Sequence, residues 1–190
     1  MPSYEAARVY PGTCLFEGTN VSVGRGTDAP FEFVGAPWFD PNRVRHALET
    51  RSLSLDAASD STTSAQNVEL PSLPGVSLQT AAFQPSIAPH QEIRCQGLRL
   101  SVDRPREFRP VRTGLILLLA VSHLHPDQFE WKPYPTAANP SGENHFERLI
   151  GKQGLRQLLE EDPGGFCERL DTLLNPAGWA RTVERWLLYD

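Results

Sequence analysis

The sequence predicts an α+β fold: a small mixed β-sheet packed against a buried helix, with several short C-terminal helices. Residues 76–83 and 92–103 alternate apolar and polar side chains as half-buried strands do. Residues 110–124 are apolar on all sides, which is typical of a buried helix. The last third has apolar residues at helical spacing, interrupted by PGG and NPAG. We expect residues 1–190 to form a single domain, because such a chain buries about two-thirds of its unfolded surface.

The first third of the chain is rich in glycine, proline and aromatic residues. We interpret residues 12–23 as a strand that leads into a tight loop, where Gly24 and Gly26 flank Arg25. Residues 30–41 read as an aromatic-rich connection without regular structure. A helix is expected from residue 41 to residue 51, because an aspartate and a proline stand at its N-cap and first helical positions.

The middle of the chain holds a polar insertion and then the two strands. Residues 56–74 are rich in Ser, Thr, Asp and Ala, so we interpret them as a mobile insertion that cannot offset the entropy of ordering. In the second strand, Cys95 stands at an odd position, whereas Leu98 and Leu100 stand at even positions. In a regular strand these side chains would point to opposite faces. A β-bulge at Gly97 would turn both sets toward one core.

Composition and charge limit the functions that the chain can have. It carries 18 basic and 23 acidic residues, a net charge of −5, so no overall positive field attracts nucleic acid or an anionic membrane. The longest apolar run, Leu115 to Val121, is too short to span a bilayer. Neither a nucleic-acid partner nor a membrane span is therefore expected, and the absence of a visible signal peptide leaves localisation open.

Residues 17–27 are the candidate site, because they place several polar side chains between glycines with little apolar cover. This density suits a polar ligand such as a sugar. Glu17 is open to three interpretations: a general acid, an acceptor for sugar hydroxyls, or the ion-pair partner of Arg25. The predicted ligand-binding residues beside it are Asn20, Ser22, Gly24, Arg25, Gly26 and Thr27.

Other chemistry has weaker support. His123 and His125 are two residues apart at a helix end and point to different faces, so they favour no metal site. Cys14 has no context typical of a nucleophile, and the three cysteines lack zinc-ligand spacing, so we expect reduced thiols. The GRG triplet lacks the third glycine of a dinucleotide fingerprint. Neither a metal nor a cofactor is predicted.

Four stretches carry a resemblance to a known family. YPGTCLFEGTNVSVGRGT, PFEFVGAPW, the CxGLRLSVDRxxxFRPVRTGL block and HFERLIG resemble, in the same order, the C-terminal domain of a bacterial family known as DUF1343. That family is associated with the NamZ exo-β-N-acetylmuramidases, which remove terminal N-acetylmuramic acid from peptidoglycan fragments. Its members place a larger Rossmann-like domain before this one and are often exported. The resemblance implies that the chain is the C-terminal, cleft-forming part of such a glycoside hydrolase.

The same resemblance implies roles for individual residues of the candidate site. Glycoside hydrolysis normally needs two carboxyl groups, and the N-terminal domain that would carry the principal ones is absent from this sequence. Glu17 is the candidate for one of the pair, with Asp28 and Glu32 the next places to look. Arg25 could hold the lactyl carboxylate of muramic acid in a bidentate contact, aided by the N–H groups of Gly24 and Gly26. The expected partners are a peptidoglycan-derived muramic acid sugar and a separate N-terminal catalytic domain.

Two other functions stay open: a non-catalytic sugar-binding or interaction module, and an inactive truncated relic. The hypothesis that the chain is the C-terminal part of an enzyme also predicts a surface on which the N-terminal domain would dock. We expect an exposed aromatic patch there, formed by Phe31, Phe33, Trp38 and Phe39.

Overall fold

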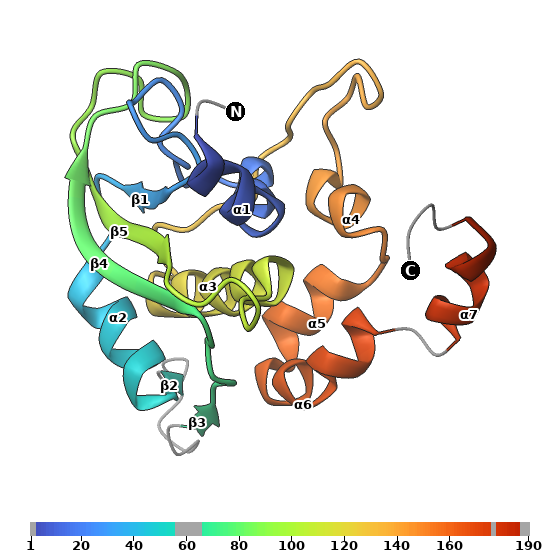
Figure 1. The fold of residues 1–190 in the computed structure, drawn as a ribbon. Coiled ribbons are helices and arrows are strands. Elements are labelled where there is room, and N and C mark those ends of the chain that lie inside the picture. The colour runs from blue at the N-terminus through green and yellow to red at the C-terminus, as the bar shows by residue number, and fades with distance from the viewer. Residues whose placement is uncertain (1–2, 56–65, 176–177, 187–190) are drawn as a thin grey trace.

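The computed structural model describes residues 3–55, 66–175 and 178–186, and its fold class is α+β as predicted (Figure 1). The helices, with the two 3-10 helices η1 and η2, are α1 (Tyr4–Thr13), η1 (Cys14–Gly18), α2 (Pro41–Thr50), α3 (Pro110–Leu124), α4 (His145–Ile150), α5 (Leu155–Glu161), α6 (Pro163–Leu174), α7 (Trp179–Val183) and η2 (Glu184–Trp186). The strands are β1 (Phe33–Ala36), β2 (Ser52–Leu55), β3 (Gln66–Glu69), β4 (Val76–Phe83) and β5 (Cys95–Val102).

The strands form two antiparallel sheets, so the expectation of a mixed sheet is wrong. The larger sheet has the order β1-β5-β4, and β2 and β3 form a separate pair. The predicted strand at 12–23 does not exist, and β1 takes its place beside β5. A single loop joins β4 to β5, which permits the antiparallel pairing that the structure shows.

Residues 12–18 of the segment predicted as the first strand belong instead to a helix and a 3-10 helix, and residues 19–23 follow with isolated β-bridges at Thr19 and Ser22. Ser3 starts α1 as its N-cap, because its Oγ accepts a hydrogen bond from the Ala6 N–H at 2.9 Å. Ala6 and Val9 bury one face of α1 in the core. Pro11 lies in the last turn of the helix, and the chain continues through η1. Pro11 and Gly12 are therefore accommodated near the end of a helix.

Residues 33–36 form a strand, although residues 30–41 were expected to have no regular structure. Phe33 and Phe39 are buried, and Phe31 and Trp38 are half-buried against the core. The expected exposed aromatic patch is therefore wrong. The reason is that β1 pairs with β5 and is buried on both faces, so the ring of Phe33 stacks on that of Phe83 at a centroid distance of 4.8 Å.

The bulge expected at Gly97 is also absent. The β4–β5 register runs without interruption from the Phe83–Cys95 pair to the Val76–Val102 pair. Leu98 belongs to the main core, whereas Cys95 belongs to a smaller buried cluster with Phe33 and Phe83. The change of parity therefore reflects a strand with two buried faces rather than an extra residue.

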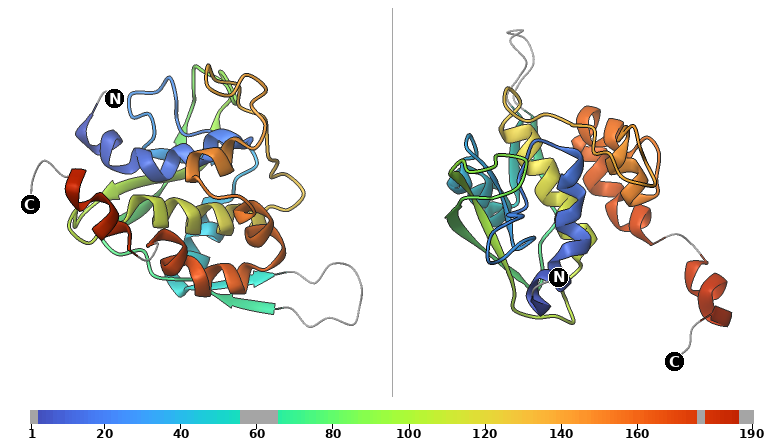
Figure 2. Two further views of the ribbon diagram at one scale, coloured as in Figure 1. Left: turned by 90° about the vertical axis from the view of Figure 1, so that its right-hand side faces the viewer. Right: turned by 90° about the horizontal axis from the view of Figure 1, so that it is seen from above.

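Two predicted helices are confirmed. Asp40 caps α2, since its Oδ1 accepts hydrogen bonds from the N–H groups of Asn42 and Arg43 at 3.0 Å each. In α3, residues 115–121 are completely buried. This helix lies between the larger sheet and the helices α4 to α6 (Figures 1 and 2). It is the central element of the core.

Part of the predicted mobile insertion is ordered. Residues 56–65 lie outside the described residues, but β3 follows directly and pairs with β2. Leu70 is fully buried, as is Leu53 of β2. The prediction is therefore wrong for residues 66–74, because these apolar side chains complete a small hairpin on the core.

The C-terminal third folds into short helices as predicted. Their buried faces carry Phe146, Leu155, Leu159, Phe166 and Leu170. In the described ranges, every helix is too short or too polar to cross a membrane.

Candidate functional site

Glu17 and Arg25 meet in the structure, together with Tyr134 from a distant loop. The Glu17 Oε1 atom accepts hydrogen bonds from Arg25 Nη1 at 2.9 Å and from the Tyr134 hydroxyl at 3.2 Å. Arg25 Nη1 also donates to the Tyr134 hydroxyl. The Glu17 side chain is only 11% exposed, whereas that of Arg25 is 34% exposed. We call these three residues the Glu17 cluster.

Local packing fixes the position of this cluster. Glu17 lies in η1, directly after α1, and the next residue, Gly18, packs on the start of α4. A Cβ atom on Gly18 would lie 3.2 Å from the Phe146 backbone nitrogen, so only a glycine fits easily. This close approach brings η1 beside α4.

His145, the first residue of α4, extends the cluster on one side. Its ring centroid lies 4.6 Å from that of Tyr134. His145 is buried, and among the described residues its Nε2 atom has no hydrogen-bond partner. It lines a cavity of about 290 Å³ together with Trp131 and Arg156. A buried nitrogen without a partner is unusual in a folded protein, and such atoms are retained where a ligand or water completes the bonding.

Burial favours the neutral forms of the two tyrosines and the histidine in and around the cluster. Burial, and then the Glu17 charge, raises the pKa of the Tyr134 hydroxyl. Burial also raises the pKa of Tyr10, with Cys14 and Glu17 adding to the effect. Burial lowers the pKa of His145, although the Glu17 charge acts in the opposite direction. The cluster therefore offers a ligand the second carboxylate oxygen of Glu17 and the remaining N–H donors of Arg25, because the O–H of Tyr134 already donates to Glu17.

Asn20 is held by backbone bonds rather than presented to a ligand. Its Nδ2 donates to the Gln128 carbonyl at 2.7 Å, and its Oδ1 accepts from the Glu130 N–H at 3.0 Å. Both ends of the side chain amide thus tie residue 20 to the segment that leads toward Tyr134.

Ser22 and Thr27 also bond to the backbone. Ser22 is 1% exposed, and its Oγ accepts from the Gly24 N–H at 3.2 Å. Thr27 Oγ1 donates to the Gly24 carbonyl at 2.7 Å and accepts from the Ala29 N–H at 3.2 Å. The structure therefore uses these hydroxyls to shape the loop around Arg25.

Gly24 and Gly26 have positive φ angles of 69° and 81°, as the predicted tight loop requires. A Cβ atom would lie 2.8 Å from the Phe33 ring at Gly24, and 2.2 Å from the Ser86 Oγ at Gly26. The loop thus lies closely on the sheet, and this contact directs Arg25 toward Glu17.

The two alternative carboxylates lie in different surroundings. Glu32 is buried and accepts hydrogen bonds from Arg99, at 2.9 Å to Nη2, and from the Ser3 hydroxyl at 3.0 Å. Asp28 is exposed. Neither has a described bond to the Glu17 cluster, so the structure does not join either of them to it.

The weaker chemical alternatives gain no support. Burial, and then Glu17, raises the pKa of the Cys14 thiol to about 11, so the nucleophilic thiolate is scarce at neutral pH. The imidazole of His125 bonds through both nitrogens, accepting from the Asp40 N–H at 3.0 Å and contacting the Val121 carbonyl at 3.1 Å. Within the ranges that the structure describes, no three His, Cys, Asp or Glu side chains are grouped to hold a metal ion.

Sequence reasoning missed Tyr134 and His145 as site residues. His145 begins the HFERLIG stretch, so that motif was a signal for it. Tyr134 stands 117 residues after Glu17 in a proline-rich loop, and no local pattern identifies it.

Fold and site together define an α+β domain in which a carboxylate, a guanidinium and a phenol from three separate segments meet. A model of the family "Exo-beta-N-acetylmuramidase NamZ, C-terminal" matches residues 8–189, and the chain belongs to this family. It is 32% identical over 160 residues to the Peptidoglycan beta-N-acetylmuramidase NamZ of Bacillus subtilis (strain 168). That match covers 84% of the chain but only 32% of the relative, so the chain spans about a third of the relative's length.

A solved structure supports the fold. The chain is similar to a DUF1343 family protein from Bacteroides fragilis NCTC 9343, with a TM-score of 0.65 and 16% sequence identity. The match covers 97% of this chain and 42% of that protein. The resemblance noted from the sequence is therefore confirmed at the level of family and fold.

Proposed function

We propose that this chain is the part of an exo-β-N-acetylmuramidase that contacts the muramic acid sugar of peptidoglycan fragments, through the Glu17 cluster. The observation that carries the proposal is the three-way contact among Glu17, Arg25 and Tyr134, which come from three separate segments. Family membership and the relative from Bacillus subtilis supply the substrate class. The Nε2 atom of His145, which has no hydrogen-bond partner in the described part of the chain, adds a polar group that a sugar hydroxyl could satisfy.

Arg25 is the candidate for recognition of the lactyl carboxylate, which distinguishes muramic acid from glucosamine. The described bonds of its side chain all use Nη1, so Nε and Nη2 keep their N–H donors for a carboxylate. The Gly24 N–H is already bonded to Ser22 Oγ, so it gives no aid here. Glu17 and Tyr134 hold the guanidinium in place.

Glu17 has a binding and positioning role in this proposal. Its Oε1 is shared between Arg25 and Tyr134, while the hydroxyls of a sugar could still donate to Oε2. Hydrolysis normally needs a pair of carboxyl groups about 5–10 Å apart, and a separate N-terminal catalytic domain would supply the principal ones. The chain alone would then bind sugar without cleaving it.

Sugar binding by calorimetry tests this role for Arg25. We expect Arg25→Lys to weaken binding of N-acetylmuramic acid by roughly 1–3 kcal/mol and to leave N-acetylglucosamine unaffected, because lysine keeps the charge but not the planar fork. Arg94→Lys is the matched control, since Arg94 is exposed and lies outside the cluster. Equal losses for the two sugars would show that Arg25 is structural, and absence of binding by the unmodified chain would favour the inactive relic.

A complementation assay tests the catalytic part. The purified chain should not turn over a chromogenic N-acetylmuramide, because loss of one partner of a catalytic pair costs several orders of magnitude in rate. Adding the separately expressed N-terminal part of the Bacillus subtilis relative should restore turnover. Turnover by the chain alone would contradict the proposal, and sugar binding without restored turnover would favour a non-catalytic sugar-binding module.

A further inference from the structure

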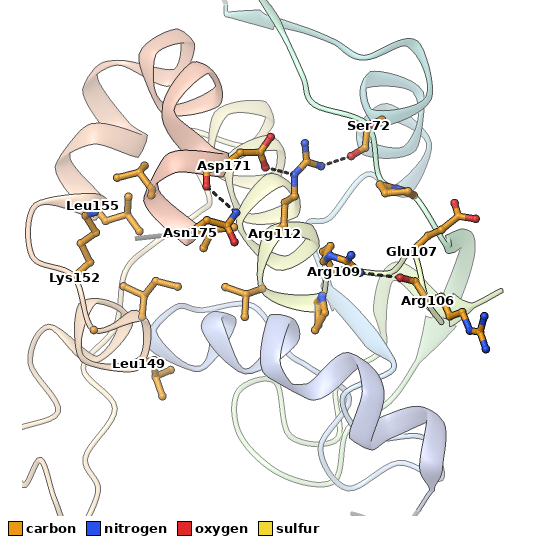
Figure 3. A pocket seen from close by; sticks show the side chains of 17 residues that line it. Ser72, Arg106, Glu107, Arg109, Arg112, Leu149, Lys152, Leu155, Asp171 and Asn175 are labelled. Atoms are coloured by element: carbon orange, nitrogen blue, oxygen red, sulfur yellow. Dashed lines mark hydrogen bonds and ion pairs between the residues drawn. The ribbon is translucent and has the colours of Figure 1, made fainter. Parts of the chain in front are cut away.

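A second cavity, of about 1080 Å³, opens at the start of α3 (Figure 3). Leu149, Lys152 and Leu155 lie along one side of it, and Arg106 and Arg109 lie along the other. Sites for drug-sized ligands typically measure about 300–1,000 Å³, so this cavity can hold a ligand of that size. Its lining comes from four parts of the chain: 72–74, 106–112, 149–155 and 171–175.

The cavity is positively charged, although the whole chain has a net charge of −5. Four basic and two acidic side chains line it. Both acids are already paired: Asp171 with Arg112 at 2.8 Å, and Glu107 at 3.1 Å with Arg104, which lies outside the lining. In the described parts of the chain, Arg106 and Lys152 have no acidic partner.

The positive charge is therefore in excess on both sides of the cavity. Arg109 uses Nη1 to bond the backbone carbonyls of residues 106 and 108, which leaves its charge without an acidic partner among the described residues. The N-terminal end of the 15-residue helix α3 adds potential of the same sign. An anionic group is the complement of this lining.

The rest of the lining is apolar. It includes Val111, Leu149, Ile150, Leu155, Leu173 and Leu174. Leu149 is 40% exposed, so part of its side chain is accessible to a ligand. Burying these side chains would stabilise a ligand by about 25 cal/mol for each Å² of apolar surface removed from water.

We propose that this cavity binds an amphiphilic organic anion. A carboxylate or phosphate group would lie against Arg106 and Arg109, with Lys152 adding positive potential from the other side, and an alkyl portion would pack on Leu149 and Leu155. No residue of the Glu17 cluster lines the cavity, so this site is independent of the proposed muramidase function.

Calorimetric titration of the full chain with octanoate and octyl phosphate, below their micelle concentrations, tests the proposal. We expect saturable binding that is at least tenfold tighter than that of the neutral octyl glucoside and that weakens as salt is added. The better of the two anions identifies the preferred head group. Amide resonances of residues 106–112 and 149–155 should shift during the same titration.

Two variants and a control locate the charge. Arg106→Gln and Lys152→Gln should each weaken anion binding about threefold to tenfold, whereas the exposed Arg94→Gln outside the cavity should not. Leu149→Asn should weaken the binding of octanoate. It should also reduce the ratio of the affinity for octanoate to the affinity for butyrate. The proposal is wrong if neither anion binds, if octyl glucoside binds equally well, or if Arg106→Gln and Lys152→Gln match Arg94→Gln.

Discussion

The contact between α1 and α3 depends on two glycines, and it predicts a large effect of one methyl group. An ideal Cβ atom on Gly114 would lie 2.2 Å from the Gly12 carbonyl oxygen and 2.6 Å from its carbonyl carbon. Ordinary contact begins at 3.4 Å, so the two helices would have to separate by about 1 Å. The obstacle is backbone, which cannot rotate away as a side chain can.

The free energy follows from two opposing effects. Overpacking of a core costs about 1–3 kcal/mol, and a backbone obstacle places Gly114→Ala at the upper end of that range. Replacing a glycine inside a helix by alanine returns about 1 kcal/mol through helix propensity. We therefore expect Gly114→Ala to lower the free energy of unfolding by about 2 kcal/mol.

Urea unfolding at 25 °C, followed by circular dichroism, measures this change as a shift in midpoint at constant slope. Gly164 in α6 is the matched control, because a Cβ atom there would have nothing within 4 Å. Gly164→Ala should raise the free energy of unfolding by about 0.4–1 kcal/mol. The reasoning fails if Gly114→Ala is as stable as the unmodified chain, or if the two alanines shift the midpoint alike.

Three further predictions concern other parts of the molecule. Asp40→Ala should lower the free energy of unfolding by about 1 kcal/mol, because the N-cap of α2 is lost. Asp40→Asn should lower it less, since asparagine can also cap a helix, and urea unfolding of both variants measures this order. Burial lowers the pKa of His125 below its usual 6.5, so the unfolded chain binds more protons in mild acid. Stability should therefore fall from pH 7 toward pH 5, and the urea midpoint of His125→Gln should depend less on pH; an unchanged slope would contradict the assignment. Burial raises the pKa of all three thiols to about 11, so iodoacetamide at pH 8 should alkylate the folded chain slowly. Mass spectrometry should detect the label on the partly exposed Cys167 before it detects the label on the buried Cys14 and Cys95.

The helices that the sequence predicted correctly are those with local signals. Asp40 and Pro41 mark the start of α2 within two residues, and α3 shows apolar residues on all sides between Pro110 at its start and Pro126 just beyond its end. Such signals act over a few residues and do not depend on distant contacts. They could therefore be identified before the structure was known.

The elements that were predicted wrongly depend on contacts between distant residues. The strand β1 exists because Gly35 and Gly97 let two backbones meet, since a Cβ atom on Gly35 would lie 2.2 Å from the Gln96 carbonyl oxygen. The helix α1 contains Pro11, which argues locally against a helix, but it packs through Gly12 on α3. In both cases tertiary packing outweighs the local preference.

The candidate site divides in the same way. Glu17 and Arg25 are eight residues apart, so the possibility that they pair could be read from the sequence. Tyr134 reaches them only because its loop is closed: its N–H donates to the Gly142 carbonyl at 3.0 Å. Gly142 has a φ of 73°, and a Cβ atom there would lie 2.5 Å from the Tyr134 nitrogen. The third member of the cluster is thus placed by a loop closure and a chain reversal that only the folded backbone reveals.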